Sequence, residues 1–317
     1  MIGKYEIEIY NNRIHYFLTI KRNITILQGN SATGKTELIR LIADREENGE
    51  SSGITIKSEA PCTVLTTIDW EIRLDNLNKH IIFIDESASF IKTEQFAKRV
   101  RGSDNYFVII TRDDLPQLPY SIEEILGLKN VSSSSKYKSY KRIYNETYKL
   151  YNLEQDKKSI FDTVITEDTN AGYECFDLIY DNCISAGGKS KIYNTIRQNL
   201  KRHMLVIVDG AAFGSEISKV YRYIQVNNID CVIYAPESFE YLILSAKIVD
   251  ISLDMLENTY MYADSTRYMS WEEFYTSILV DLSRDSVFRY SKSKLAESYK
   301  SDNVVNRIIS MLPYYIR

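Results

Sequence analysis

The first half of the chain alternates strand-like runs with a helical repeat. Residues 4–20 alternate apolar and polar positions and turn at Asn11-Asn12, which predicts a β-hairpin. Residues 36–45 repeat apolar side chains at helical spacing. Continuous apolar runs predict three buried strands of a parallel sheet, within residues 23–28, 80–87 and 105–114.

The second half alternates strand and helix patterns at short spacing, which predicts a smaller parallel sheet with helices packed on it. The alternation runs through residues 161–180, 183–200, 203–225 and 230–244. Later segments have only helical patterns, one of them opening with a Ser270-x-x-Glu273 capping box. The expected fold class is therefore α/β. We expect a first domain at 1–129, a connecting segment at 130–155, and a second domain with C-terminal helices at 156–317.

The connecting segment differs in composition from the rest of the chain. It is serine-rich and then basic, with tyrosines among the cations: Lys136, Tyr137, Lys138, Tyr140, Lys141 and Arg142. One interpretation is a solvated linker followed by a helix. The other is a strip that follows a phosphate backbone and stacks on bases.

Composition limits the class of protein. The 317 residues include 26% charged residues and give a formal net charge of -4, so any nucleic-acid surface must be a local patch. Four cysteines without a C-x-x-C pair indicate reduced thiols. The first residues lack the apolar core of a signal peptide, and no apolar run approaches membrane-spanning length. We expect a soluble cytoplasmic protein with no membrane partner.

The run between the first buried strand and the first helix matches the Walker A motif, G-x-x-x-x-G-K-T. In this motif, backbone N–H groups and the start of the helix surround the β-phosphate of a nucleotide. Lys35 would neutralise the β- and γ-phosphates, and the Thr36 hydroxyl would bind Mg²⁺. The expected ATP-binding residues are Gly29, Asn30, Ser31, Ala32, Thr33, Gly34, Lys35 and Thr36.

A second motif supports a nucleotide site. The run "HIIFIDES" (80–87) ends in two carboxylates, as a Walker B strand does. Asp85 would hold the Mg²⁺ of the nucleotide, and Glu86 would act as the general base toward the attacking water. Thr111 follows the third strand, where it would either sense the γ-phosphate or simply mark the end of the strand.

Acidic residues follow three of the predicted strands in the second half. Glu167, Asp209 and Glu237 all come just past strand ends, so they should converge on one edge of the sheet. Clustered carboxylates bind hard cations, which predicts a second site for Mg²⁺ or Mn²⁺. Alternatively, Asp209 and Glu237 cap the following helices and bind nothing.

Both halves resemble known families. A hairpin leading into a Walker A strand resembles the ATP-binding-cassette ATPases, including the ATPase heads of the overcoming-lysogenization-defect (OLD) nucleases. The second half, over about residues 160 to 245, resembles the topoisomerase-primase (TOPRIM) domain that is fused to those heads. On this resemblance Glu167 matches the first glutamate of TOPRIM, and Asp209 matches the first aspartate of its Asp-x-Asp. Ala211 stands where the second aspartate belongs.

The resemblance implies an ATPase coupled to metal-dependent cleavage of nucleic acid, which in related families often serves defence against phage or mobile DNA. It also implies a homo-oligomer or a complex with a partner protein. Lys35 and Asp85 are only 50 positions apart, however, and we find no signature Ser-Gly-Gly loop between Glu37 and Lys79. The alternative, favoured by Ala211, is a nucleotide-gated sensor or binding module whose TOPRIM-like domain is catalytically inactive and serves recognition.

Overall fold

The computed structural model describes residues 1–29, 33–131, 142–200 and 202–317, which form two compact units. Unit 1 comprises Met1–Tyr151 and Tyr260–Ser270, and unit 2 comprises Asn152–Thr259 and Trp271–Arg317. This differs from the division expected from sequence. Part of the supposed connecting segment forms a strand of unit 1, and a short stretch of the chain returns to unit 1 after the sheet of unit 2 is complete.

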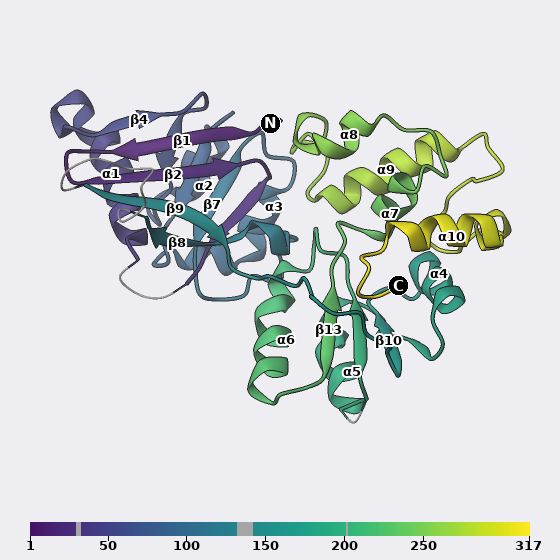
Figure 1. The fold of residues 1–317 in the computed structure, drawn as a ribbon. Coiled ribbons are helices and arrows are strands. Elements are labelled where there is room, and N and C mark those ends of the chain that lie inside the picture. Colours follow the sequence, from purple (N-terminus) through teal and green to yellow (C-terminus); the bar gives the residue numbers. More distant parts are fainter. Residues whose placement is uncertain (30–32, 132–141, 201) are drawn as a thin grey trace. The chain divides into compact units, whose positions relative to one another are not determined.

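Unit 1 is built on a mixed sheet, which within the described residues has nine strands in the order β4-β1-β2-β9-β8-β3-β7-β6-β5 (Figure 1). One half of the sheet is mainly antiparallel, and the half from β3 to β5 is parallel. In spatial order the strands are β4 (Thr55–Lys57), β1 (Tyr5–Tyr10), β2 (Ile14–Ile20), β9 (Ile143–Lys149), β8 (Ile125–Asn130), β3 (Ile24–Leu27), β7 (Tyr106–Ile110), β6 (Ile81–Ile84) and β5 (Cys62–Val64).

The three predicted buried strands are confirmed as β3, β6 and β7, and every residue of each is buried. Their Ile, Val and Phe side chains suit a parallel sheet that is covered on both faces. Helix α1 (Lys35–Asn48) buries Leu38, Leu41 and Ile42 in the same apolar core. The other helices of unit 1 are α2 (Trp70–Asp75) and α3 (Glu94–Val100).

The predicted hairpin is confirmed as strands β1 and β2, which pair antiparallel from Tyr5↔Ile20 to Tyr10↔His15. The Asn11 side chain shapes the turn, because its carbonyl oxygen accepts the N–H groups of Arg13 and Ile14 at 2.8 and 3.0 Å. Strand β2 then pairs with β9, so residues near 145 extend the sheet beside the hairpin.

Unit 2 has the predicted small parallel sheet, with four strands among the described residues in the order β11-β10-β12-β13. The strands are β10 (Thr163–Thr166), β11 (Cys183–Ser185), β12 (Met204–Ile207) and β13 (Cys231–Tyr234). The helices are α4 (Ala171–Ile179), α5 (Ile192–Gln198), α6 (Gly214–Val226), α7 (Phe239–Ser245), α8 (Leu253–Glu257), α9 (Trp271–Ser283) and α10 (Asp302–Met311).

Two groups of helices cover this sheet. Helices α5 and α6 contact each other, while α4 contacts α10 and the strands β10 and β11 (Figure 1). The carboxyl ends of the four parallel strands meet at one edge, where the acidic residues were expected. No helix in the described parts of the chain is long and apolar enough to cross a lipid bilayer.

Candidate nucleotide site and the acidic edge of unit 2

Two glycines of the segment between β3 and α1 have a backbone conformation with positive φ. Gly29 has φ of 118° and Gly34, immediately before α1, has φ of 92°. Both values lie in a region that residues with a Cβ rarely adopt. Gly34 is also crowded, since a Cβ there would come within 2.7 Å of the Tyr16 hydroxyl oxygen. That hydroxyl donates a hydrogen bond to the Gly34 carbonyl at 2.8 Å, which ties the start of α1 to β2.

Lys35 is held inside the loop that precedes it. Its side-chain nitrogen donates to the Gly29 carbonyl at 3.1 Å and to the Thr33 hydroxyl at 2.9 Å, and only 8% of the residue is exposed. Burial lowers the pKa of Lys35, the positive charge of Arg112 lowers it further, and Glu86 acts in the opposite direction. An ammonium group held by carbonyl and hydroxyl oxygens is ready to exchange these contacts for phosphate oxygens.

An open cavity extends from Lys35 toward the ends of β6 and β7. Its walls carry three cationic side chains and two carboxylates, one of which is Glu86. The Glu86 carboxylate forms an ion pair with the Arg112 guanidinium at 3.4 Å, and both side chains are about half exposed, at 44% and 54%. The lining residues are Thr33, Gly34, Lys35, Thr36, Glu37, Arg40, Glu86, Ile110 and Arg112.

The remaining expected nucleotide-site residues are placed as follows. Thr36 is exposed on the first turn of α1, and Asp85 follows β6 and accepts the Ser87 hydroxyl at 2.8 Å. Thr111 is buried, and its hydroxyl oxygen accepts the Asp113 N–H at 3.0 Å, so it stabilises the turn after β7. Asn30, Ser31 and Ala32 lie outside the described residues.

This arrangement suits a nucleoside triphosphate. The start of a long helix, Gly34 with its positive φ and three cationic side chains line one cavity, and each of these features favours phosphate oxygens. The Thr36 hydroxyl and the Asp85 carboxylate are oxygen donors of the kind that Mg²⁺ requires. Glu86 is the one Walker B carboxylate that lines the cavity itself.

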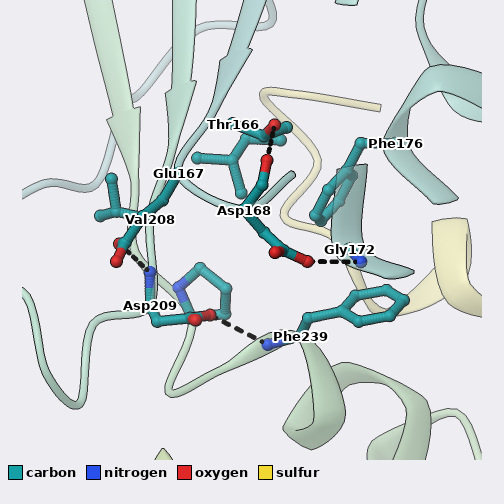
Figure 2. Close-up of a pocket in the computed structure, with 10 residues that line it drawn as sticks. Thr166, Glu167, Asp168, Gly172, Phe176, Val208, Asp209 and Phe239 are labelled. Carbon is teal, nitrogen blue, oxygen red and sulfur yellow. Dashed lines mark hydrogen bonds between the residues drawn. The ribbon is translucent and has the colours of Figure 1, made fainter. Parts of the chain in front are cut away.

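In unit 2 the structure brings Glu167 and Asp209 together at the carboxyl edge of the sheet (Figure 2). Glu167 follows β10 directly, and Asp209 follows the neighbouring β12. A Glu167 carboxylate oxygen accepts the Asp209 N–H at 3.2 Å, and an Asp209 carboxylate oxygen accepts the Phe239 N–H at 3.2 Å. Phe239 is the first residue of α7, so the Asp209 side chain bonds to the start of α7 and not to the start of α6, the following helix that it was expected to cap.

The neighbouring acid, Asp168, has a local structural role. One of its carboxylate oxygens accepts the N–H of Gly172 at 2.8 Å (Figure 2), and the other accepts those of Thr169 and Asn170. These donors belong to the first turn of α4 and the residues just before it, where N–H groups have no partner within the helix. Asp168 therefore anchors α4 at the edge of the sheet.

Both acids at this edge bind protons more tightly than usual. Burial raises the pKa of Glu167 to about 7, despite its bond from the Asp209 N–H. Burial also raises the pKa of Asp209 well above its ordinary range, and the negative charges of Glu272 and Glu167 raise it further. Desolvation and like charges both disfavour the carboxylate form, so the edge holds more negative charge than it readily accommodates.

A lysine of the chain compensates for part of this charge. The Lys292 ammonium lies 2.5 Å from a Glu272 carboxylate oxygen. Burial disfavours the charged form of Lys292, but the attraction of Glu272 and Glu240 outweighs that effect and raises the pKa of the lysine. Asp209 contributes to the same attraction. The buried Glu240 carboxylate also accepts a hydrogen bond from the Tyr290 hydroxyl at 2.9 Å.

The expected set of three carboxylates does not form. Glu167 and Asp209 line the small cavity at the edge, whereas Glu237 is not among its lining residues. Within the described residues no group of three or more His, Cys, Asp or Glu side chains is arranged to hold a metal ion. Ala211 supplies no ligand, and its N–H is occupied by the Glu237 carbonyl at 3.1 Å. The donor set therefore does not fit a hard divalent cation held by Glu167, Asp209 and Glu237.

The chain matches no family model, no curated protein and no solved structure. Its functional assignment therefore depends on the motifs and on the geometry of the two sites.

Sequence patterns did not identify several residues of these sites. Tyr16 was expected only as a strand residue, and Arg112 only as one of two polar residues, with Thr111, at a place that either senses the γ-phosphate or ends the strand. In unit 2, Lys292 and Tyr290 lie beyond the sheet in a segment without a periodic pattern. The signal that could have identified Arg112 is its place next to Thr111, directly after a buried strand.

Proposed function

We propose that unit 1 is a P-loop ATPase domain that binds ATP in the cavity beside α1 and hydrolyses it. The observation that carries this proposal is that Lys35 and Glu86 line the same open cavity, and that Glu86 is close enough to act on the charge of Lys35. A phosphate-binding cation and a carboxylate able to activate water are thus available to the same ligand. This is the arrangement that phosphoryl transfer to water requires.

In the proposed reaction the backbone N–H groups at the start of α1 and the Lys35 ammonium bind the β- and γ-phosphates. Glu86 accepts a proton from the water that attacks the γ-phosphorus, and ADP leaves. Arg112 lies beside Glu86 and supplies positive charge close to the transferred group. A Mg²⁺ ion held by Thr36 and Asp85 would neutralise charge on the phosphate oxygens.

The proposal is tested by equilibrium binding and turnover of ATP with Lys35→Ala. This change removes the cation that faces the phosphates, and we expect loss of ATP binding with the fold intact. Lys92→Ala is a matched control, because Lys92 is a half-exposed lysine of unit 1 that pairs with Asp113 and does not line the cavity. Equal ATP affinity and turnover in both variants would remove the assignment.

For unit 2 the sequence offered two functions, metal-dependent cleavage of nucleic acid and recognition without catalysis. We propose recognition, by a TOPRIM-like domain that has lost its metal site. The charge arrangement supports this choice, because Lys292 supplies positive charge to the acidic edge and the third carboxylate is missing. The whole chain would then be a nucleotide-gated binding module. A cytoplasmic role in defence against phage or mobile DNA, together with a homo-oligomer or a partner protein, is the biological setting that the family resemblance suggests.

A nuclease assay separates the two functions. Plasmid DNA, linear DNA and RNA are incubated with the protein in Mg²⁺ or Mn²⁺, with and without ATP. We expect no cleavage under any of these conditions. Cleavage that is lost in Asp209→Ala but retained in Asp230→Ala, an exposed acid at the other end of the sheet, would instead establish unit 2 as a nuclease.

A further inference from the structure

The surface of helices α5 and α6 carries a concentration of positive charge that the proposed ATPase does not use. Between Asp181 and Asp209 the sequence contains five lysine or arginine residues and no aspartate or glutamate, although the whole chain has a net charge of -4. This stretch includes α5 and the short turn of 3-10 helix before it, Lys189–Lys191. The charge bias is therefore local, and three exposed cations of this region lie on α6 (Lys219), on α5 (Arg197) and directly before α5 (Lys191).

Tyr193 organises the cations of this face. The Lys219 ammonium of α6 lies over the Tyr193 ring, 4.3 Å from its centroid, and the Arg197 guanidinium lies 5.7 Å from the same centroid. The Tyr223 ring packs edge to face against Tyr193, with 4.9 Å between the two centroids. Two cations from neighbouring helices are thus held beside one aromatic ring, and cation–π attraction offsets part of their mutual repulsion.

These cations have no acidic partners in the described part of the chain. Lys191, Arg197 and Lys219 are exposed, and no aspartate or glutamate forms an ion pair with any of them. Elsewhere on unit 2, the exposed Arg284 and the partly buried Lys300 do pair with carboxylates. Exposed cations without acidic partners, on and directly before two packed helices, favour a ligand that carries several negative charges.

We propose that the α5–α6 face of unit 2 binds the phosphodiester backbone of nucleic acid without regard to base sequence. The Lys191, Arg197 and Lys219 side chains would contact successive phosphates, with Tyr193 holding the last two in place (Figure 1 shows both helices). Because Lys219 already covers the Tyr193 ring, the ring positions cations and does not stack on a base. The inference rests on the recognition role proposed for unit 2 and names the ligand class and the surface.

The experiment measures fluorescence anisotropy of labelled single-stranded DNA, duplex DNA and RNA with the full chain in EDTA and without ATP. Under these conditions only binding is measured. The result therefore does not depend on whether unit 1 is an ATPase or on whether unit 2 has nuclease activity. The variant is Arg197→Gln with Lys219→Gln. The matched control is Lys157→Gln with Lys158→Gln, which makes the same charge change at exposed positions of unit 2. Both control residues directly precede Ser159, whose backbone N–H donates a hydrogen bond to the carbonyl of Tyr315, a residue that follows α10.

We expect the wild-type protein and the control to bind nucleic acid with an affinity that falls steeply between about 50 and 200 mM salt. The Arg197→Gln, Lys219→Gln variant should bind roughly tenfold or more weakly, and its log–log salt slope should be smaller by about 1 to 2 units. The single-stranded, duplex and RNA arms identify which nucleic acid is preferred. Equal binding by variant and control, or no binding by wild type, would overturn the proposal. The proposal would also be overturned if polyglutamate bound the wild-type protein as tightly as nucleic acid and lost affinity equally in the Arg197→Gln, Lys219→Gln variant. The face would then be a docking site for an acidic protein.

Discussion

The Tyr16 hydroxyl donates a hydrogen bond to the Gly34 carbonyl at 2.8 Å and lies where a Cβ on residue 34 would have to fit. A strand of the antiparallel half of the sheet thereby fixes the backbone at the start of α1. The contact links the hairpin to the cavity where ATP is proposed to bind.

Gly34→Ala should abolish ATP binding. Positive φ costs an alanine about 1 to 2 kcal/mol, and the added Cβ also meets the Tyr16 hydroxyl oxygen at 2.7 Å. Tyr16→Phe alone should cost about 1 kcal/mol of stability and leave ATP binding within a few-fold of wild type. The double variant should recover part of the binding lost in Gly34→Ala, since the next contacts of the Cβ are at 3.6 Å. Calorimetric titration with ATP measures all three, and no recovery in the double variant would show that the Tyr16 contact does not matter.

The acidic edge of unit 2 predicts a dependence of stability on pH. The pKa of Glu167 is raised to about 7 in the folded protein, above its ordinary value of 4.5, so between these values the folded state binds more protons than the unfolded state. Unit 2 should therefore lose stability as pH rises from about 4.5 to 7, and Glu167→Gln should remove the part of that loss that Glu167 contributes. At pH 8 the variant should be more stable than wild type by roughly 1 to 3 kcal/mol.

Urea unfolding at several pH values without nucleotide measures this effect. Glu174→Gln is a suitable control, because Glu174 is an acid of the same unit on the surface of α4. A Glu167→Gln variant that is less stable than wild type at pH 8 would contradict the assignment, since it would mean that the folded protein stabilises the Glu167 carboxylate.

Much of the fold was predictable because its signals are local. The hairpin, the three buried strands of unit 1 and the four parallel strands of unit 2 each follow from runs of residues that are contiguous in sequence. Strand β9 was not expected, because its charged and polar residues resemble a linker until they pair with β2 and β8. Its place in the sheet depends on partners that are distant in sequence.

The sites were predictable to the extent that a motif or a strand end defines them. Lys35, Glu86, Glu167 and Asp209 all follow from local patterns, and the structure places them in pairs at two sites. Lys292 could not be predicted, because its relation to Asp209 and Glu272 exists only after the chain has folded. The position of Glu237 could not be predicted either. Its place after a strand suggested a metal ligand, but its side chain does not line the edge cavity.

Lys292→Gln tests whether a lysine of the chain takes the role of a metal ion. Removing the ammonium leaves the neighbouring carboxylates with less positive charge, and unit 2 should lose roughly 1 to 3 kcal/mol of stability. We expect wild-type unfolding to be the same in EDTA and in Mn²⁺, and the variant to be stabilised by Mn²⁺. Lys300→Gln, which breaks surface ion pairs with Glu297 and Glu174, is the control and should cost under about 1 kcal/mol. Saturable stabilisation of the wild-type protein by Mn²⁺ would instead restore the metal-site hypothesis.

The central claim is that Glu86 activates water against ATP held by Lys35, and Glu86→Gln tests it most directly. ATP binding and ATP turnover are measured in parallel on wild type, on Glu86→Gln and on Glu94→Gln, an acid at the start of α3 outside the cavity. We predict that Glu86→Gln binds ATP within a few-fold of wild type and hydrolyses it about 10² to 10⁴ times more slowly, because an amide cannot accept the proton. Turnover within a few-fold of wild type, or a wild-type protein that does not bind ATP, would contradict the account.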